Sequence, residues 1–267
     1  MKLPIITLLL IAISLLSLGA CHKDTKSSKT FVLVAGAWQG AYVWQSVKAQ
    51  LESKGQKVIV VELPAHGSDT TSPALVSIDI YRDKVIDAIN TVNDKVILVG
   101  HSMAGMVVTE IAEKIPEKIE KLVFIAAFVP ANGQALLDLA STDSLSQLGP
   151  SLIPSANQLT LDVIPANRIS IFCQDGSDSI KTLLLNNFRV EPAIPFANKV
   201  TITSVNFGAV DKYYIHTTQD HAISLNLQNR MVASANITKE YSLNTGHSPF
   251  LSAPDQVTNT LIDIMNQ

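Results

Sequence analysis

The chain contains little cysteine, with only Cys21 and Cys173 in 267 residues. Cys21 closes an apolar N-terminal run, so Cys173 has no partner for a disulfide in the rest of the chain. Cysteine–histidine clusters with zinc spacing and EF-hand loops are also missing, and we expect no metal ion and no cofactor. The formal net charge of −3 gives no sign of a basic surface for nucleic acid.

A hydrophobic run long enough to span a membrane is missing as well. Residues 5–18 are mostly apolar and follow Lys2, but as a helix they would be only about 21 Å long, against a hydrocarbon core of about 30 Å. This pattern predicts a cleaved signal peptide at 1–20. The stretch from Leu18 to Cys21 resembles the lipobox of bacterial lipoproteins, which implies a lipid on Cys21, anchoring in the bacterial cell envelope and a polar tether at 21–29. The alternative is an ordinary signal peptide that happens to end near a cysteine.

Residues 30–267 are predicted to form one domain in which strands and helices alternate. Such alternation is typical of an α/β protein with a doubly wound, mostly parallel sheet. Short apolar runs predict buried strands, and recurrence of apolar residues every three or four positions predicts helices. The strands are expected at 31–35, 57–61, 96–99, 119–126, 212–216 and 237–243, and the helices at 44–54, 78–92, 103–115, 223–230 and 255–265.

The alternation stops after Pro130 and resumes near residue 212. Prolines interrupt the intervening region, and helices are predicted there only at 136–148 and 180–188, with a short strand at 168–172. We interpret residues from about 131 to 210 as a cap inserted between two strands of the main sheet.

Ser102 lies in the stretch VILVGHSMAG at 96–105, where an apolar strand runs directly into a helical pattern. A strand, a sharp turn with a serine at its apex and a helix make up the nucleophile elbow, which exposes the serine hydroxyl at the edge of a sheet. The residues two before and two after the serine must be small, and here they are Gly100 and Ala104. Ala104 departs by one methyl group from the usual G-x-S-x-G pattern. The stretch predicts Ser102 as a nucleophile.

A serine nucleophile needs a base and an acid that orients the base. On this kind of sheet the order along the chain is serine, acid, histidine, with each residue on a loop after a strand. His247 follows the last predicted strand, and Asp220 follows the strand at 212–216 by a short loop. Asp220 also suits the N-cap of the next helix. The other histidines do not follow the last strand: His22, His66, His101, His216 and His221.

The oxyanion of an acyl-transfer intermediate needs two backbone donors. The N–H of Met103, directly after the serine, is the first prediction. Ala37, in the loop after the first strand, is the second, because Gly36 lets the backbone approach closely. Trp38 and Phe128 stand at strand ends near the predicted site, where they either line a substrate pocket or belong to the core.

These segments resemble the α/β-hydrolase superfamily, in particular plant methyl esterases, hydroxynitrile lyases and related bacterial carboxylesterases. The resemblance covers nearly all of the chain after the tether and implies the α/β-hydrolase fold, a triad of Ser102, Asp220 and His247, and a small cap over the site. The histidine-glycine of the family's oxyanion loop is Ala35-Gly36 here. Ser248 stands where some hydroxynitrile lyases have a lysine after the triad histidine, which favours ester hydrolysis over cyanohydrin cleavage. The resemblance rests on VLVAGAWQG at 32–40, VILVGHSMAG at 96–105, FIAAFVP at 124–130, TQD at 218–220 and GH at 246–247.

The sequence thus predicts an envelope-anchored serine esterase that forms an acyl-enzyme on Ser102. Its expected partner is a small, apolar ester, with membrane contact only through the N-terminal lipid and no nucleic acid. Other reactions on the same scaffold, by a lactonase, a C–C hydrolase or a hydroxynitrile lyase-like enzyme, remain alternatives. A non-catalytic ligand-binding lipoprotein and a tethered structural protein are alternatives of a different class. The sequence does not determine the substrate or the oligomeric state.

Overall fold

A computed structural model describes residues 28–267. The predicted signal peptide, the lipid attachment site at Cys21 and most of the tether lie outside the described residues. Within 28–267, no helix is both long enough and apolar enough to cross a membrane.

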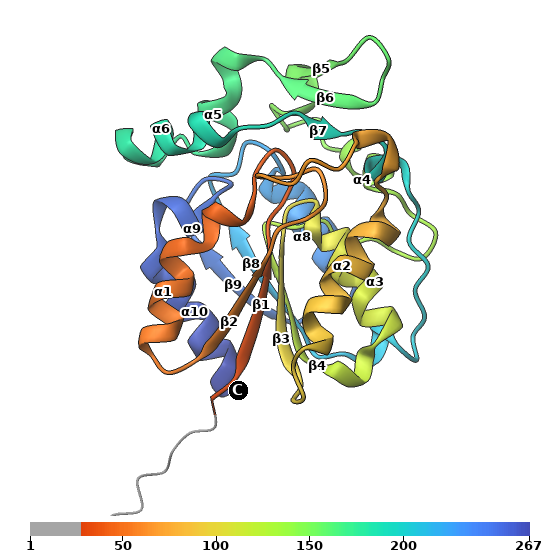
Figure 1. The fold of residues 1–267 in the computed structure, drawn as a ribbon, viewed down its shortest axis with the longest axis vertical. Coiled ribbons are helices and arrows are strands. Elements are labelled where there is room, and N and C mark those ends of the chain that lie inside the picture. Colours follow the sequence, from red (N-terminus) through yellow and green to blue (C-terminus); the bar gives the residue numbers. More distant parts are fainter. Residues whose placement is uncertain (1–27) are drawn as a thin grey trace, which may run out of the picture.

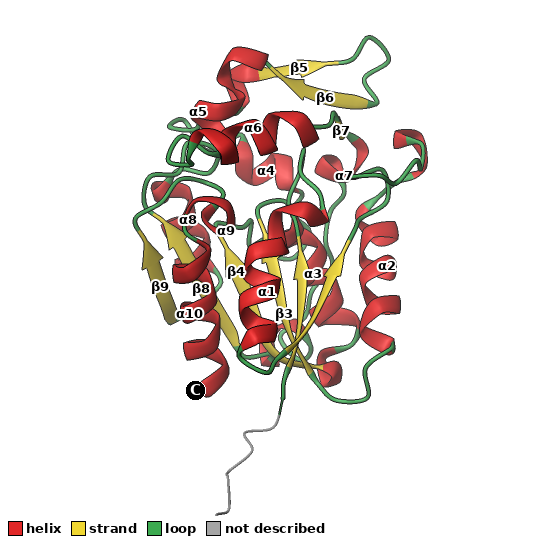
Figure 2. Cartoon of the chain, turned by 60° about the vertical axis from the view of Figure 1, so that its left-hand side comes forward, coloured by secondary structure: helices red, strands yellow, loops and turns green. Residues whose placement is uncertain are grey.

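The centre of the domain is a six-stranded sheet (Figures 1 and 2). Every pair of neighbouring strands is parallel, which confirms the predicted doubly wound architecture. The strand order is β2-β1-β3-β4-β8-β9, and each strand falls within two residues of its predicted position. The bounds are β1 (Thr30–Val34), β2 (Lys57–Val61), β3 (Val96–His101), β4 (Ile119–Ile125), β8 (Lys212–Thr217) and β9 (Lys239–Leu243).

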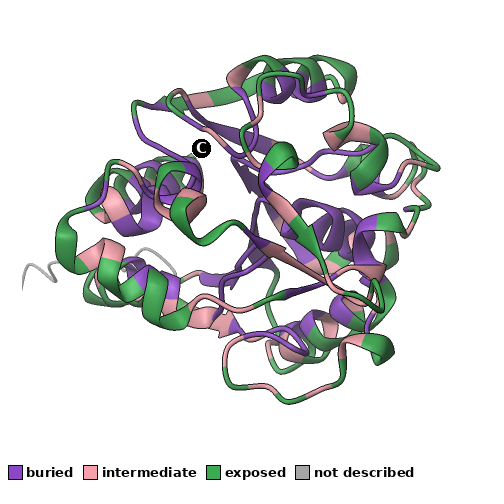
Figure 3. Cartoon of the chain, turned by 90° about the horizontal axis from the view of Figure 1, so that it is seen from above, coloured by how far each residue is buried: buried purple, intermediate pink, exposed green. Residues whose placement is uncertain are grey.

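Helices cover both faces of this sheet, with α1 (Gln45–Ser53) and α10 (Pro254–Asn266) packed together on one face, and α2 (Ile78–Asn90) and α3 (Ala104–Lys114) on the other (Figure 1). Helices α1, α2 and α10 bury their apolar sides and leave their polar sides exposed, whereas α3 is buried over most of its length, so that buried segments run through the middle in Figure 3. Gly55, with φ of +81°, follows the end of α1 as predicted. Two further helices, α8 (Leu225–Ser234) and α9 (Pro249–Ser252), lie on either side of β9 in the chain.

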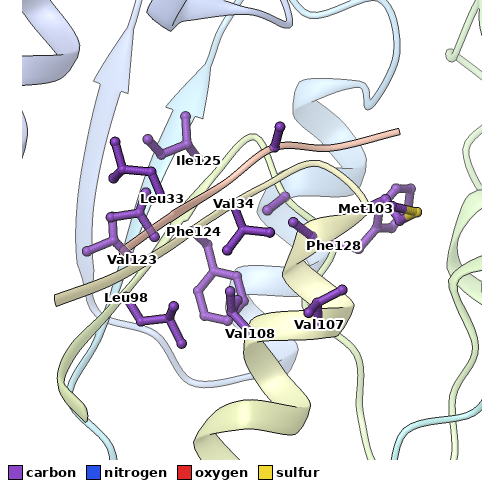
Figure 4. Packing of buried hydrophobic residues seen from close by; sticks show 14 of the residues in the cluster. Leu33, Val34, Leu98, Met103, Val107, Val108, Val123, Phe124, Ile125 and Phe128 are labelled. Carbon is purple, nitrogen blue, oxygen red and sulfur yellow. The ribbon is translucent and has the colours of Figure 1, made fainter. Parts of the chain in front are cut away.

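Part of the hydrophobic core lies where β1, β3 and β4 meet α3 (Figure 4). The residues of β1 and β3 are buried on both sides of the sheet, which explains why these strands are mostly apolar in sequence, and β4 is apolar and buried from Leu122 to Ile125. The side chains of Val107 and Val108 on α3 pack over Leu98 and Phe124. This packing fixes the position of the turn that joins β3 to α3.

The cap covers the carboxyl ends of the strands (Figure 1). It contains a three-stranded antiparallel sheet that the sequence analysis did not predict. Two expectations were wrong: residues 168–172 form a helix rather than a strand, and the helix predicted at 136–148 ends at Ala140. The cap elements are α4 (Leu136–Ala140), β5 (Leu152–Pro154), β6 (Thr160–Val163), α5 (Arg168–Phe172), α6 (Asp178–Asn187), β7 (Glu191–Pro192) and α7 (Ile194–Ala197).

Both errors have local causes. The hydroxyls of Ser141 and Thr142 donate to the carbonyls of Asp138 and Leu139, which closes the first cap helix after little more than one turn. The apolar run at 168–172 is too short for its periodicity to separate strand from helix. A 3₁₀ turn that begins at Pro165 leads directly into α5, because proline suits the first turn of a helix.

Candidate active site

Ser102 occupies the sharp turn between β3 and α3. Its φ is +55°, in the left-handed region that non-glycine residues seldom adopt, and its N–H donates to the carbonyl of Ile125 at 3.3 Å. A Cβ on Gly100 would lie 2.7 Å from Cγ2 of Val108 and 2.9 Å from the carbonyl oxygen of Ala104. The turn therefore requires glycine before the serine, and it stores backbone strain at the serine itself.

The second glycine that this turn requires lies one residue later than in the G-x-S-x-G pattern. A Cβ on Gly105 would lie 2.0 Å from the carbonyl oxygen of Phe128, whose own N–H donates to the carbonyl of Ser102 at 3.1 Å. Ala104 is completely buried and is accommodated without a clash. Gly105 is therefore the residue at which the two backbone segments come closest. This explains why a methyl group is tolerated at position 104.

Asp220 and His247 meet at the same end of the sheet. Oδ2 of Asp220 accepts a hydrogen bond from Nδ1 of His247 at 2.8 Å, and both side chains are buried. Oδ1 of Asp220 accepts from the N–H groups of Ala222 and Ile223 at 2.7 and 2.9 Å, and the hydroxyl of Thr217 donates to Oδ2 at 2.8 Å. The carboxylate is therefore held from several directions, and it directs Nε2 of His247 away from itself.

The N-cap of α8 is Ser224 rather than Asp220. The hydroxyl oxygen of Ser224 accepts from the N–H of Leu227 at 3.2 Å. Asp220 binds backbone N–H groups in the turn before the helix, so its alternative role as the N-cap is wrong. Its carboxylate is left to orient His247.

The imidazole of His101 is a part of the site that the sequence analysis missed. Its Nε2 donates to the backbone carbonyl of His247 at 2.9 Å, and the two rings lie 4.6 Å apart. Burial, with a smaller contribution from His247, holds the pKa of His101 well below its usual value, so this ring is neutral. Gly36 lies against the same turn, because a Cβ there would be 2.6 Å from Cβ of Ser102. His101, the residue before Ser102 in the sequence, thus holds the loop that carries His247.

The N–H groups of Ala37 and Met103 have no acceptor among residues 28–267. Both residues line the same cavity as Ser102. Two backbone N–H groups without an acceptor, beside a serine at the edge of a sheet, are the donors that an oxyanion hole requires.

The cavity beside Ser102 has a volume of about 80 Å³ and a mostly apolar lining. Trp38 and Phe128 both line it, together with leucines of the cap. Asp143 supplies the one ionisable side chain of the lining; its carboxylate accepts from the N–H and the hydroxyl of Ser224 at 2.8 and 2.5 Å. The other residues of the lining are neutral.

The cap holds the loops around the cavity by hydrogen bonds. The side-chain amide of Gln174 donates to the carbonyl of Gln219 at 2.6 Å, and Oδ2 of Asp175 accepts from the N–H of Gly246 at 2.8 Å. These bonds connect α5 and its C-terminal turn to the loops that carry the buried acid and histidine. The neighbouring thiol of Cys173 is buried, and burial together with the charge of Asp175 raises its pKa to about 12, so it is a poor nucleophile.

Among the described residues, no group of three or more histidine, cysteine and acidic side chains is arranged to hold a metal ion.

Comparisons with known proteins agree with the fold. The sequence profile of the alpha/beta hydrolase family matches residues 31–260. The chain is 31% identical over 254 residues to putative methylesterase 11, chloroplastic, of Arabidopsis thaliana; the match covers 90% of this chain and 65% of that relative. It is 27% identical over 257 residues to an alpha-hydroxynitrile lyase of the same plant, with coverages of 86% and 95%. The crystal structure of polyneuridine aldehyde esterase superposes with a TM-score of 0.77 at 25% identity, covering 89% of this chain and 99% of that one.

Proposed function

The chain belongs to the alpha/beta hydrolase family, and on this basis we propose that it is a serine esterase acting on carboxylic esters of small apolar compounds. The observation that carries the proposal is the combination at one edge of the sheet: a strained Ser102 beside two free backbone donors, with a buried Asp220–His247 pair. A structural or ligand-binding lipoprotein would not need this combination.

In the proposed acylation step, the hydroxyl oxygen of Ser102 attacks the ester carbonyl carbon while Nε2 of His247 takes the hydroxyl proton. The N–H groups of Ala37 and Met103 donate to the oxyanion that forms. Asp220 keeps the proton on Nδ1 of His247 and stabilises the imidazolium. Collapse of the intermediate breaks the bond to the alkoxy group, which leaves as an alcohol after His247 returns the proton.

In the proposed deacylation step, water takes the place of the alcohol. His247 removes a proton from the water as the water attacks the acyl carbon, and the same two N–H groups stabilise the second oxyanion. The acid is then released, and the proton returns to the hydroxyl of Ser102.

The size and polarity of the cavity support a small, neutral substrate. Its volume of about 80 Å³ is smaller than the cavity of about 150 Å³ that accommodates benzene in an engineered protein core. A short acyl group or a small alcohol group fits a cavity of this size, and a methyl ester, as the names of the relatives suggest for those proteins, is one such substrate. The Asp143 carboxylate disfavours an anionic group in the same space.

Cyanohydrin cleavage is less well supported than ester hydrolysis. It releases a cyanide ion, which needs a cation or strong donors in the cavity. Ser248 follows His247, and its hydroxyl oxygen accepts from the side chain of Gln39 at 2.9 Å rather than facing an anion site. Lactone opening and C–C hydrolysis would use the same residues and differ in the groups that the cap accommodates.

We also propose that the protein is anchored in the bacterial cell envelope by a lipid on Cys21. The proposal rests on the apolar run and the lipobox-like stretch at the N-terminus. After expression of the full chain in a bacterium, the wild type should fractionate with membranes and carry a diacylglyceryl mass on the mature N-terminus, and Cys21→Ala should not. Equal fractionation of both proteins in the soluble phase would contradict the proposal.

Hydrolysis of p-nitrophenyl acetate and butyrate tests the esterase proposal, with Ser102→Ala as the inactive variant. The matched control is Ser53→Ala, because Ser53 is exposed on α1 and its hydroxyl bonds only the carbonyl of Gln50. We expect the wild type and Ser53→Ala to turn over the esters equally, and Ser102→Ala to lose about 10⁴- to 10⁶-fold in kcat. Equal turnover by all three proteins would overturn the proposal.

A further inference from the structure

We propose that Glu191, on β7 of the cap, is a positioning residue for the oxyanion hole: it holds the peptide of Trp38 next to the donor at Ala37, so that the hole is formed only when the cap is docked. This inference rests on the proposed function. Glu191 acts through the backbone of the loop and is not expected to touch the substrate.

The polar groups of Trp38 are all bound to the cap. Its N–H donates to Oε2 of Glu191 at 2.7 Å, and its carbonyl accepts from the N–H of Arg189 at 3.3 Å. The indole N–H donates to the carbonyl of Leu161 on β6 at 2.9 Å. The indole ring also contacts two cap side chains, with centroid distances of 5.5 Å to Phe172 and 5.7 Å to Phe196.

The backbone of Trp38 needs such support. Its φ is +60°, a left-handed conformation that a bulky side chain seldom adopts, so the loop does not favour this shape by itself. The N–H that Glu191 binds belongs to the peptide that directly follows Ala37. Fixing this peptide fixes the ψ angle of Ala37, the residue whose own N–H is the proposed oxyanion donor.

Glu191 is fully buried, which is costly for a carboxylate unless strong partners compensate for the lost hydration. Oε2 lies 3.0 Å from Nε2 of His66, which comes from the loop after β2, while Oε1 has no hydrogen-bond partner among the described residues. Burial lowers the pKa of His66, but the charge and hydrogen bond of Glu191, together with the carbonyl of Pro64 and the charge of Glu62, raise the pKa overall. A buried carboxylate in the interface between cap and core, with one oxygen 2.7 Å from a strained backbone N–H, is better explained by positioning than by packing.

A test compares Glu191→Ala and Glu191→Gln with a matched control, Glu110→Ala. Glu110 is also a buried carboxylate; its Oε1 accepts from the N–H of Thr201 at 2.7 Å and its Oε2 lies 3.6 Å from Arg82, but it sits on α3 away from the oxyanion loop. The glutamine variant keeps an oxygen that can accept from Trp38, whereas the alanine variant does not. Steady-state kinetics with p-nitrophenyl butyrate give kcat and KM for each protein.

We expect Glu191→Ala to lose about 10²- to 10³-fold in kcat, as when one oxyanion donor is removed, with KM changed by less than about threefold. Glu191→Gln should recover most of this loss, and Glu110→Ala should keep the wild-type kcat. The rate at which a fluorophosphonate labels Ser102 should fall in parallel with kcat, because the phosphonate also places an oxyanion in the hole. If Glu191→Ala does not fold, Glu191→Asp is used in its place. The aspartate keeps the negative charge, but its shorter side chain moves the carboxylate oxygen away from the N–H of Trp38.

Tryptophan fluorescence gives a second measurement that does not depend on activity. The chain has two tryptophans, and Trp44 is fully buried with its ring against Phe250 of α9, so a red shift of the emission in Glu191→Ala would report release of Trp38. A folded Glu191→Ala with kcat within threefold of the wild type, or with only KM changed, would overturn the inference while leaving the esterase proposal intact. If the wild type does not hydrolyse esters, the esterase proposal fails instead, and an unshifted emission would then refute the Glu191–Trp38 contact separately.

Discussion

His101 donates a hydrogen bond to the backbone carbonyl of His247 at 2.9 Å, and so connects the serine turn directly to the loop of the proposed base. His101 is the residue before Ser102, so movement of the turn is transmitted to the histidine loop without passing through either proposed catalytic side chain. The ring of Phe250 stacks edge-on against His101 at 4.7 Å and helps to keep it buried. Two segments separated by more than half of the domain are thereby held in one arrangement.

The buried, neutral state of His101 predicts a contribution to acid sensitivity. Its pKa in the folded protein is well below the value of about 6.5 in the unfolded chain, so unfolding takes up a proton once the pH falls below about 6.5. Its stabilising contribution is therefore present above that pH and is lost as the pH falls. Between pH 6.5 and 5.5, the free energy of unfolding of the wild type should fall by about 1 kcal/mol more than that of His101→Asn.

Urea denaturation at several pH values measures this difference. His66, whose pKa is raised, contributes in the opposite direction: its contribution is present below about pH 6.5 and is lost as the pH rises. Because His66 is present in both proteins, it cancels in the comparison. Parallel pH profiles for the wild type and His101→Asn would show that His101 is not neutral when folded.

Gly105 is predicted to be the glycine that the serine turn cannot lose. A Cβ there would lie 2.0 Å from the carbonyl oxygen of Phe128. Both atoms are attached directly to the backbone, so only a shift of one of the two chain segments could relieve the clash. Gly105→Ala should lower the free energy of unfolding by more than about 3 kcal/mol, at the upper end of overpacking effects. Gly208→Ala is the control, because its nearest contact would be an ordinary 3.4 Å. Urea denaturation that ranks the two variants equally would contradict the steric argument.

Asp220→Asn is predicted to leave the fold intact and to remove most of the activity. The amide can still bond to His247, but it no longer requires the proton to stay on Nδ1, so kcat should fall by about 10⁴-fold with little change in KM. The control is Asp211→Asn, since Asp211 lies at the other end of β8 and pairs with Lys239 at 2.7 Å. Kinetics that show equal, small losses in both variants would assign Asp220 a structural role only.

Acyl-chain length should follow the volume of the cavity. p-Nitrophenyl acetate and butyrate should have kcat/KM values at least about tenfold higher than the palmitate ester, because a cavity of about 80 Å³ is too small for the palmitoyl chain. Leu136→Ala enlarges the cavity and should raise the relative kcat/KM for hexanoate. Leu75→Ala, at a residue 70% exposed on the surface, is the control. The same chain-length profile in all three proteins would show that the acyl group binds elsewhere.

The parts of the fold that the sequence predicted are those in which one physical rule dominates. Continuous apolar runs identified the strands β1, β2 and β3, although β2, at the edge of the sheet, is only partly buried. The parallel arrangement brings the carboxyl ends of the strands to one edge. Asp220 and His247 were selected by their place after two such strands, and the structure brings them within 2.8 Å of each other. Ser102 was selected by the small residues around it, and its φ of +55° agrees with the expected sharp turn.

The parts that the sequence did not predict depend on contacts between distant segments. His101 was set aside as a base because it does not follow the last strand, and only the folded structure shows that it reaches the backbone of His247. Glu191 and His66 are separated by more than a hundred residues, and neither has a neighbour in sequence that identifies the pair. The short cap strands had no signal of their own, because a three-residue strand such as β5 is too short for alternation to be recognised.

The most direct test of the central claim is covalent labelling of the wild type with a fluorophosphonate, followed by peptide mass spectrometry. The claim is that the hydroxyl of Ser102 is a working nucleophile activated by His247. It predicts a stoichiometric adduct on Ser102 that is lost in Ser102→Ala and strongly slowed in His247→Ala. An unmodified Ser102, or an adduct on another residue with ester hydrolysis intact in Ser102→Ala, would contradict it.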